Sequence, residues 1–382
     1  QIENINKNTN SEVLDQILQL KKSFTGRVLI AAHHYQQESI VSIADVVGDS
    51  YRLAVIASQS DAEVILMCGV RFMAESAAIL ARPDQKVLLP DFSAGCPMAD
   101  MTTRASAEKA LASIKALTGE DAVPLTYMNS WADLKAFTGS KGGSICTSGN
   151  AKKIMSHYLS AGRKILFMPD KNLGINTARS LGLTENDMCL VSQDGLVPAD
   201  CKNARIFLWD GYCPVHLEFT PEQVFALRAK YPDITLMVHP ECVEEVVGLS
   251  NSAASTEGMA NEIARSPSGS VLGVGTEYRF IERMIRGNPD KTIVPLEKFY
   301  CSDMDRITPE NILTVLINSL QTSIQELQNH PENIDKLSQI AHRMIPMLRQ
   351  IESMVIVELL EELEDKKIPT SKTHQHIDEI FQ

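Results

Sequence analysis

The chain has 382 residues, more than one hydrophobic core usually supports, so two or three domains are expected. Hydrophobic residues make up 44% of it and charged residues 22%, and a formal net charge of -12 offers no basic surface for nucleic acid or an anionic membrane, so small-molecule partners are expected. No apolar run approaches the roughly 18 residues of a membrane span and the polar start lacks a signal-peptide core, so we expect a soluble cytoplasmic protein, or an organellar one if a targeting segment was removed.

Short apolar runs alternate with amphipathic stretches from Arg27 to Tyr300. In chain order the runs are RVLIAA, AEVILMCGV, KVLLP, VPLTYM, KILFMP, RIFLW, ITLMV, SVLGVG and TIVPL. Continuous Val, Ile and Leu runs indicate strands buried on both faces, and helical stretches such as SAEKALASIKAL and TPEQVFALRAKY between them indicate parallel βα units. The predicted fold class is therefore α/β.

The α/β region contains an internal repeat. Each unit has a polar residue at a strand end, a hydroxyl before a helix and a terminal cysteine. The three sets are His33, Ser50 and Cys96; Tyr127, Ser148 and Cys213; and His239, Thr256 and Cys301. The spacings are 17 and 46 residues in the first unit, 17 and 45 in the third, and 21 and 65 in the middle one, whose excess indicates an insertion at about residues 171–204.

The repeat predicts three αβα domains with parallel sheets around a pseudo-threefold axis, at residues 14–110, 111–219 and 220–305. Residues that follow the C-terminal ends of parallel strands face the ligand crevice, so the nine polar groups would converge on one cavity. Residues 1–13 are expected to form an N-terminal tail. Residues 306–382 read as a helical region that packs in part against the first domain.

The chain has eight cysteines, and no two form a C-x-x-C pair. This spacing argues against a zinc ribbon, a thioredoxin-like motif and a ferredoxin-type cluster. Any shared role must come from cysteines that the fold brings together, and most are expected to be small buried hydrophobes. Cys68, Cys146 and Cys242 are assigned to that class, whereas Cys189 and Cys201 lie in the insertion, where we expect them to be exposed, with a regulatory pairing as a minor alternative.

Ten motifs, in order over about residues 14–310, resemble those of quinolinate synthases. They are AAHHYQQ, GDS, GVRFMAE, GCPMAD, TYMNS, CTSGNA, WDGYCPVH, HPEC, GVGTE and YCSDM. The resemblance implies one 4Fe-4S cluster per chain, held by cysteines at the positions of Cys96, Cys213 and Cys301. Three ligands would leave one iron open to act as a Lewis acid.

The resemblance also implies a reaction, the condensation of iminoaspartate with dihydroxyacetone phosphate to quinolinate, with release of phosphate and two waters, in de novo NAD biosynthesis. L-aspartate oxidase would be the upstream enzyme, and the oligomeric state stays open. The implied substrate contacts are His33, Ser50, Tyr127, Met128, Asn129, Ser148, His239, Pro240, Glu241 and Thr256, with His216 as a further wall. Glu241 is the expected general base, Tyr35 an acid-base group, and His33 and His239 proton donors or shuttles.

The chain departs from the family pattern at His34, where family members commonly have tyrosine. We align Tyr35 with the catalytic tyrosine, so His34 is expected to point away from the cavity. Some family members carry two further cysteines before the third ligand. This chain has Pro295 and Lys298 at those positions, so a local disulfide switch there is excluded. Two alternatives remain at this point: an aconitase-like iron-sulfur hydro-lyase, and a non-enzymatic redox sensor that works by cysteine pairing.

Overall fold

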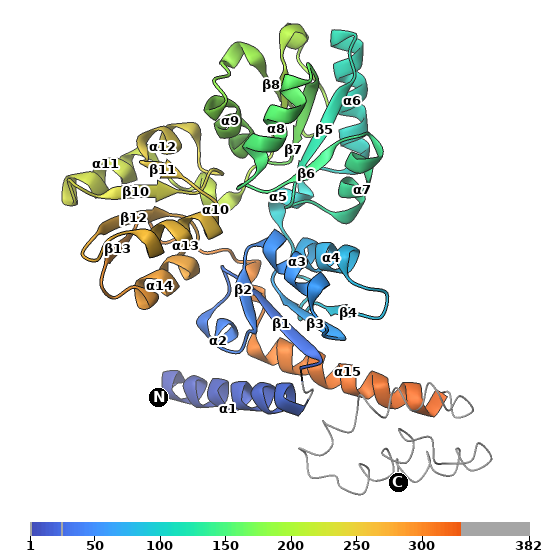
Figure 1. Cartoon of the computed structure of the whole chain (residues 1–382), viewed down its shortest axis with the longest axis vertical. Coiled ribbons are helices and arrows are strands. Elements are labelled where there is room, and N and C mark those ends of the chain that lie inside the picture. Colours follow the sequence, from blue (N-terminus) through green and yellow to red (C-terminus); the bar gives the residue numbers. More distant parts are fainter. Residues whose placement is uncertain (1, 24–25, 330–382) are drawn as a thin grey trace, which may run out of the picture.

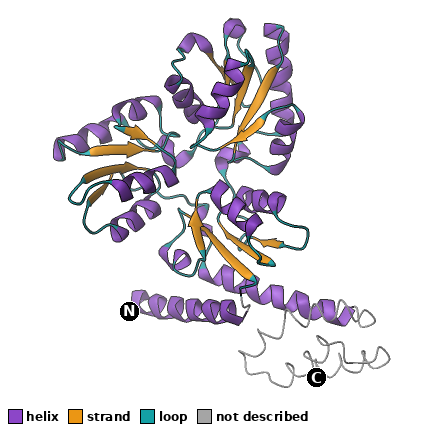
Figure 2. Cartoon of the chain, viewed as in Figure 1, coloured by secondary structure: helices purple, strands orange, loops and turns teal. Residues whose placement is uncertain are grey.

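The computed structural model describes residues 2–23 and 26–329, and the 13 strands within those ranges form three separate parallel sheets. Figures 1 and 2 show these sheets, each flanked by helices, as three lobes around a common centre. The predicted α/β class and the three αβα domains are confirmed. The domains are described in chain order below.

The first domain has a four-stranded sheet in the order β2-β1-β3-β4. Helices cover both faces of the sheet, which explains why its longer strands are continuous apolar runs instead of alternating ones. The strands are β1 (Val28–His33), β2 (Val46–Gly48), β3 (Val64–Cys68) and β4 (Lys86–Leu88), and the helices are α2 (Glu38–Val41), α3 (Ser50–Gln59), α4 (Arg71–Leu80) and α5 (Pro97–Asp100).

The second domain has five strands in the order β6-β5-β7-β9-β8. The strands are β5 (Ala122–Tyr127), β6 (Ser144–Cys146), β7 (Lys164–Met168), β8 (Met188–Val191) and β9 (Ile206–Trp209). The helices are α6 (Arg104–Thr118), α7 (Ala132–Ser140), α8 (Ala151–Ser160), α9 (Lys171–Ser180) and α10 (Pro214–Leu217), with 3-10 turns η1 (Glu185–Asp187) and η2 (Ala199–Asn203).

The position of the insertion needs correction. Residues 171–180 form α9, which follows β7 as α4 follows β3, so this part belongs to the common repeat. The additional element is the edge strand β8, with the turns η1 and η2 on either side of it. A disulfide between Cys189 and Cys201 joins β8 to η2, and Cys189 is buried, contrary to the expected exposure.

The third domain repeats the strand order of the first, as β11-β10-β12-β13. Its strands are β10 (Thr235–Val238), β11 (Ser252–Ala253), β12 (Val271–Gly275) and β13 (Thr292–Pro295). Its helices are α11 (Pro221–Lys230), α12 (Glu244–Leu249), α13 (Thr256–Arg265) and α14 (Tyr278–Gly287), followed by the turn η3 (Met304–Arg306). Four strands of each domain thus occupy matching positions, as expected for an internal repeat.

Two long helices lie side by side under the first domain, α1 (Ile2–Ser23) and α15 (Pro309–Asn329) (Figure 1). Ile17 of α1 and Ile312 and Leu316 of α15 are buried in the same apolar core as the first sheet. The tail expected at residues 1–13 is therefore wrong for residues 2–13, which belong to α1. The expected helical region is present up to Asn329, and residues 330–382 lie outside the described part of the chain.

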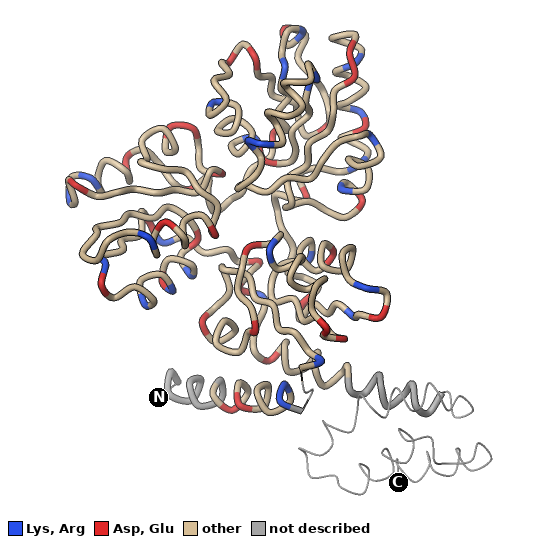
Figure 3. Tube along the Cα trace, viewed as in Figure 1, with Lys and Arg blue, Asp and Glu red and all other residues tan. Residues whose placement is uncertain are grey.

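Figure 3 shows acidic and basic residues distributed over all three domains. Within residues 2–23 and 26–329, no helix has both the length and the apolar character to cross a membrane.

Candidate active site

A cavity of about 320 Å³ is lined by residues of all three domains. Of the residues that the sequence analysis singled out, all but one line it: His33, Tyr35, Ser50, Cys96, Tyr127, Met128, Asn129, Ser148, Cys213, His216, His239, Glu241, Thr256 and Cys301. Pro240 is the exception. Its carbonyl oxygen accepts a hydrogen bond from Nδ2 of Asn176 at 2.9 Å, so Pro240 joins two domains beside the cavity instead of forming its wall.

The three lining cysteines come from three domains and occupy similar local positions. Cys96 and Cys213 are the N-cap residues of the short helices α5 and α10, each followed by a proline. Cys301 lies just before the turn η3. Backbone N–H groups of these turns favour the charged form of all three sulfurs, those of residues 98 and 99 at Cys96, of residue 216 at Cys213, and of residues 303 and 304 at Cys301. Such donors stabilise a thiolate, because they place positive dipole ends on the sulfur.

Without a metal the same thiols hold their protons. Burial raises the pKa of Cys96 to about 12 and that of Cys301 to about 11, and it also raises the pKa of Cys213. The three groups interact, since the charge on one would raise the pKa of the others. A metal that binds them must displace protons, and it would then be held by soft thiolates with backbone N–H support. This donor set fits an iron-sulfur cluster.

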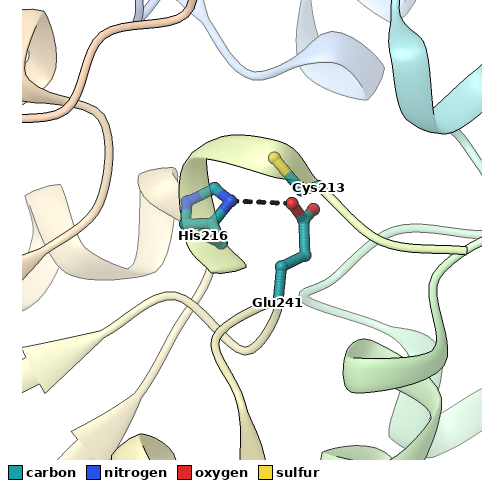
Figure 4. A group of neighbouring side chains, drawn as sticks. All are labelled: Cys213, His216 and Glu241. Atoms are coloured by element: carbon teal, nitrogen blue, oxygen red, sulfur yellow. Dashed lines mark ion pairs between the residues drawn. The ribbon is translucent and has the colours of Figure 1, made fainter. Parts of the chain in front are cut away.

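A second set of possible ligands overlaps the first. Sγ of Cys213, a ring nitrogen of His216 and a carboxylate oxygen of Glu241 lie within 4.8 Å of one another (Figure 4). Oε2 of Glu241 is 2.9 Å from Nδ1 of His216. These three donors could bind a single ion such as zinc. Because Cys213 belongs to both sets, its sulfur would be a ligand either of a cluster or of a single ion.

His33 and His239 have the same hydrogen-bonding arrangement. Each follows or ends a central strand, and its Nδ1 accepts the backbone N–H two residues further on, from Tyr35 at 3.1 Å and from Glu241 at 3.4 Å. A neutral imidazole with Nδ1 as acceptor carries its proton on Nε2. Burial lowers the pKa of His239 to about 3 and lowers that of His33 well below its ordinary value. Both rings are therefore neutral, with an Nε2–H group to donate.

Glu241 is buried among groups that favour its charged form. Burial alone would raise its pKa, but the facing rings of His239 and His216 and the hydroxyl of Tyr127 outweigh it, so the pKa of Glu241 lies below its ordinary value. The ring of His216 stacks on that of His239, with 4.4 Å between centroids. Glu241 thus provides an ionised carboxylate next to two imidazoles, which is the protonation state that a proton acceptor needs.

The hydroxyl of Tyr35 is held by two threonines. It lies 2.9 Å from Oγ1 of Thr276 and 3.3 Å from Oγ1 of Thr256. Oγ1 of Thr276 is also 3.0 Å from Nε2 of His216, so a chain of hydrogen bonds joins Tyr35 to the histidines. Burial raises the pKa of Tyr35 well above its ordinary value, which keeps the phenol protonated. Sequence reasoning missed Thr276, although it lies in the GVGTE motif.

His34 takes no part in the lining of the cavity. Its Nε2 is 3.2 Å from Oε2 of Glu257, and its Nδ1 is 2.6 Å from Nη2 of Arg283. The side chain therefore points toward the third domain, as the alignment of Tyr35 with the family tyrosine requires.

Helix N-termini supply the positive character of the cavity. Ser50 and Thr256 open the helices α3 and α13, and Ser148 lies just before α8. No lysine or arginine occurs among the described residues that line the cavity. Hydroxyls and free N–H groups at these three ends can bind carboxylate or phosphate groups without a formal charge. The N-caps Asp49 and Ser255 also line the cavity; their place directly before predicted site residues was the signal that the sequence analysis did not use.

Comparisons with known proteins identify the family of the chain. A family model described as quinolinate synthetase A protein matches residues 15–346. A quinolinate synthase of Bacillus pumilus is 40% identical over 308 residues, which cover 79% of this chain and 84% of that protein. A quinolinate synthase of Herpetosiphon aurantiacus is 40% identical over 341 residues, 86% of this chain and 91% of that protein. One from Bacillus subtilis is 39% identical over 304 residues, 78% of this chain and 83% of that protein. A match of this extent shows that the chain belongs to the quinolinate synthase family.

Proposed function

We propose that the chain condenses iminoaspartate with dihydroxyacetone phosphate to form quinolinate, with release of phosphate and two waters, in de novo NAD biosynthesis. The atoms of this equation balance without an oxidant, so the reaction calls for binding, acid-base and electrophilic catalysis only. The enzyme would be a transferase. The observation that supports the proposal best is the meeting of three cysteines, two neutral histidines, a tyrosine and a carboxylate in one cavity of a quinolinate synthase family member.

The proposed cofactor is one 4Fe-4S cluster, held by Cys96, Cys213 and Cys301. The donor chemistry supports it, because three thiols with backbone N–H donors suit a cluster better than a single hard ion. When bound, the cluster would supply an iron without a cysteine ligand, which polarises a coordinated oxygen as a Lewis acid.

Binding of the two anionic substrates is assigned to the hydroxyl groups at the helix N-termini. Ser50, Ser148 and Thr256 belong to different domains, so a substrate that contacts all three would be fixed at several points. We assign Tyr127, Met128 and Asn129 to the wall that orients it. They follow or end the central strand β5, which the second sheet holds in place.

Proton transfer is assigned to the groups around Glu241. Its carboxylate would accept a proton from carbon, and the imidazole Nε2–H groups of His33 and His239 would donate to developing oxyanions. Tyr35 can pass a proton along its hydrogen bonds to Thr276 and His216. Such a relay could protonate a departing hydroxyl group, so that it leaves the substrate as water, without bulk solvent entering the cavity.

The imine substrate hydrolyses readily, so the reaction needs a nearby source. We propose L-aspartate oxidase as that upstream enzyme, since oxidation of aspartate gives the imine directly. A cytoplasmic location, or an organelle if a targeting segment is removed, goes with this assignment.

Anaerobic purification followed by iron and sulfide analysis, with measurement of phosphate release and quinolinate formation from both substrates, tests the proposal. We expect iron, sulfide and turnover together. Iron and sulfide with dehydration of a hydroxy acid, but no phosphate release, would indicate a hydro-lyase instead. A protein that binds no iron and changes only its cysteine pairing would be a redox sensor, and one equivalent of zinc would favour the site of Cys213, His216 and Glu241.

A further inference from the structure

Each repeat ties its cysteine loop to the N-terminus of the helix that follows its third strand. The first residues of the helices α4, α9 and α14 donate their backbone N–H groups to the carbonyl two residues before the cysteine. These hydrogen bonds run from Arg71 to Ala94 at 2.8 Å, from Lys171 to Gly211 at 2.9 Å and from Tyr278 to Phe299 at 2.8 Å. Because the same contact occurs in all three domains, the helix start is a recurrent anchor point of the internal repeat, although the three loops differ in length.

In two of the repeats a buried acid strengthens this anchor. Asp170 and Glu277, the N-cap residues of α9 and α14, have side chains that are almost fully buried. Oδ1 of Asp170 accepts from the N–H of Leu173 at 2.7 Å, while Oδ2 accepts from the N–H of Cys213 at 3.2 Å. Both oxygens of one carboxyl thus join a helix N-terminus to the cysteine.

Glu277 makes the equivalent connection in the third domain. Its Oε2 accepts from the N–H groups of Arg279 at 2.8 Å and Phe280 at 3.3 Å. The backbone N–H of Cys301 also faces this carboxyl and favours its charged form. Asp170 and Glu277 occupy matching positions of the repeat, and their side chains differ in length. Each nevertheless faces both a helix N-terminus and the backbone N–H of a cysteine.

The cysteine loop of the first domain is anchored by other residues. Val70 stands at the N-cap position of α4 and offers no side-chain acceptor. Its cysteine loop is instead held from outside, where Nη1 of Arg306 lies 3.3 Å from Oγ of Ser93 and Nδ2 of Asn311 lies 3.5 Å from Oδ2 of Asp91. Each of the three cysteine loops therefore has a polar anchor.

Helix capping alone does not explain buried acids at these positions. Thr220 caps α11 with a hydroxyl at a half-buried site, which is sufficient for a helix start. A carboxyl inside the protein costs free energy unless its oxygens are well hydrogen-bonded. A carboxyl group has two oxygens, so it can cap the helix with one and accept from the cysteine N–H with the other, whereas a threonine hydroxyl has a single oxygen.

We propose that Asp170 and Glu277 are positioning residues that hold the backbones of Cys213 and Cys301, so that both sulfurs point into the cavity for the metal group. This deepens the proposed function, because it concerns the ligands of the same site. Asn or Gln at these positions has one acceptor oxygen instead of two, so the connection between helix and cysteine would break while side-chain size stays the same.

The first test needs no metal. In metal-free protein, alkylation of each cysteine by iodoacetamide is followed by peptide mapping in Asp170→Asn, Glu277→Gln and the control Thr220→Ala. We expect Cys213 to react about tenfold faster in Asp170→Asn, and Cys301 in Glu277→Gln, as the loss of one buried hydrogen bond predicts. Unchanged rates, or equal acceleration of both cysteines in each variant, would overturn the proposal.

The second test uses anaerobically loaded protein and measures the rate of iron release to a chelator. Each acid variant should release iron roughly 10–100-fold faster, the usual effect of losing a group that orients a metal ligand, while Thr220→Ala should match the parent. Release at the parental rate in both acid variants would contradict the inference. If the parent itself takes up no iron and sulfide, the proposed function fails, and the alkylation pattern alone decides on Asp170 and Glu277.

Discussion

Replacing Tyr35 with phenylalanine removes one hydroxyl from the proposed relay. That hydroxyl lies 2.9 Å from Oγ1 of Thr276 and 3.3 Å from Oγ1 of Thr256. Thr276 keeps His216 as a partner, so the free energy of unfolding should fall by only about 1 kcal/mol, as for one neutral hydrogen bond. Loss of an acid-base group should lower kcat about 100-fold or more. Turnover, iron content and the unfolding midpoint would be measured on the same preparation.

The chain offers a matched control. The hydroxyl of Tyr158 on α8 lies 2.6 Å from Oγ of Ser144 and 3.2 Å from the carbonyl oxygen of Gly142, and Tyr158 does not line the cavity. Tyr158→Phe should therefore cost similar stability and leave kcat unchanged. Near-parental turnover in Tyr35→Phe, or an equal loss in Tyr158→Phe, would refute the assignment of Tyr35.

Three further predictions concern the cysteines and the response to acid. Serine at any of Cys96, Cys213 and Cys301 should abolish iron and sulfide binding, whereas serine at Cys68, Cys146 or Cys242 should keep the metal and cost roughly 1–3 kcal/mol of stability. Reduction of the Cys189–Cys201 disulfide should lower the free energy of unfolding by about 2–4 kcal/mol with unchanged iron content; loss of iron would contradict this. Burial lowers the pKa of His34 from 6.5, so below that pH the unfolded chain binds a proton that the folded chain does not, and stability should fall. Denaturant unfolding of metal-free protein at pH 7 and pH 5 should show a smaller difference in His34→Gln, and equal differences would speak against it.

Much of the fold could be predicted because the repeat has local signals. Continuous apolar runs marked the strands, and the 17-residue spacing from His33 to Ser50 recurs from His239 to Thr256. In the structure both spacings lead from the end of a central strand to the start of a helix, at α3 and α13. The insertion was placed too early, because nothing in the sequence of the ten-residue helix α9 distinguishes a helix of the common repeat from inserted chain.

The anchors of the cysteines could not be predicted in this way. Asp170 and Cys213 are 43 residues apart, and an acid at a helix start is normally read as an exposed cap. Only the fold reveals that Asp170 is buried with one oxygen left for a cysteine. The same holds for Thr276, whose hydroxyl forms hydrogen bonds with Tyr35 and His216, two residues that are remote from it in sequence.

The division of the apolar cores bears on how a substrate reaches the cavity. One core runs without a break from the first domain into the second, through residues such as Phe72, Met128 and Phe167. The third domain has its own separate cores. Its contacts with its neighbours include the hydrogen bond between Glu257 and His34 and the ion pair between Glu244 and Arg179.

Water can replace polar contacts at little cost, whereas parting an apolar core exposes surface that water solvates poorly. In metal-free protein the third domain should therefore part from its neighbours more readily than the first two domains part from each other. Such parting would open the cavity on the side of Glu241 and Thr256, whereas a cluster bound by Cys96, Cys213 and Cys301 would tie the three domains together. High salt, which weakens the exposed ion pairs, should loosen the contacts of the third domain and speed amide hydrogen exchange there before it affects the apolar cores.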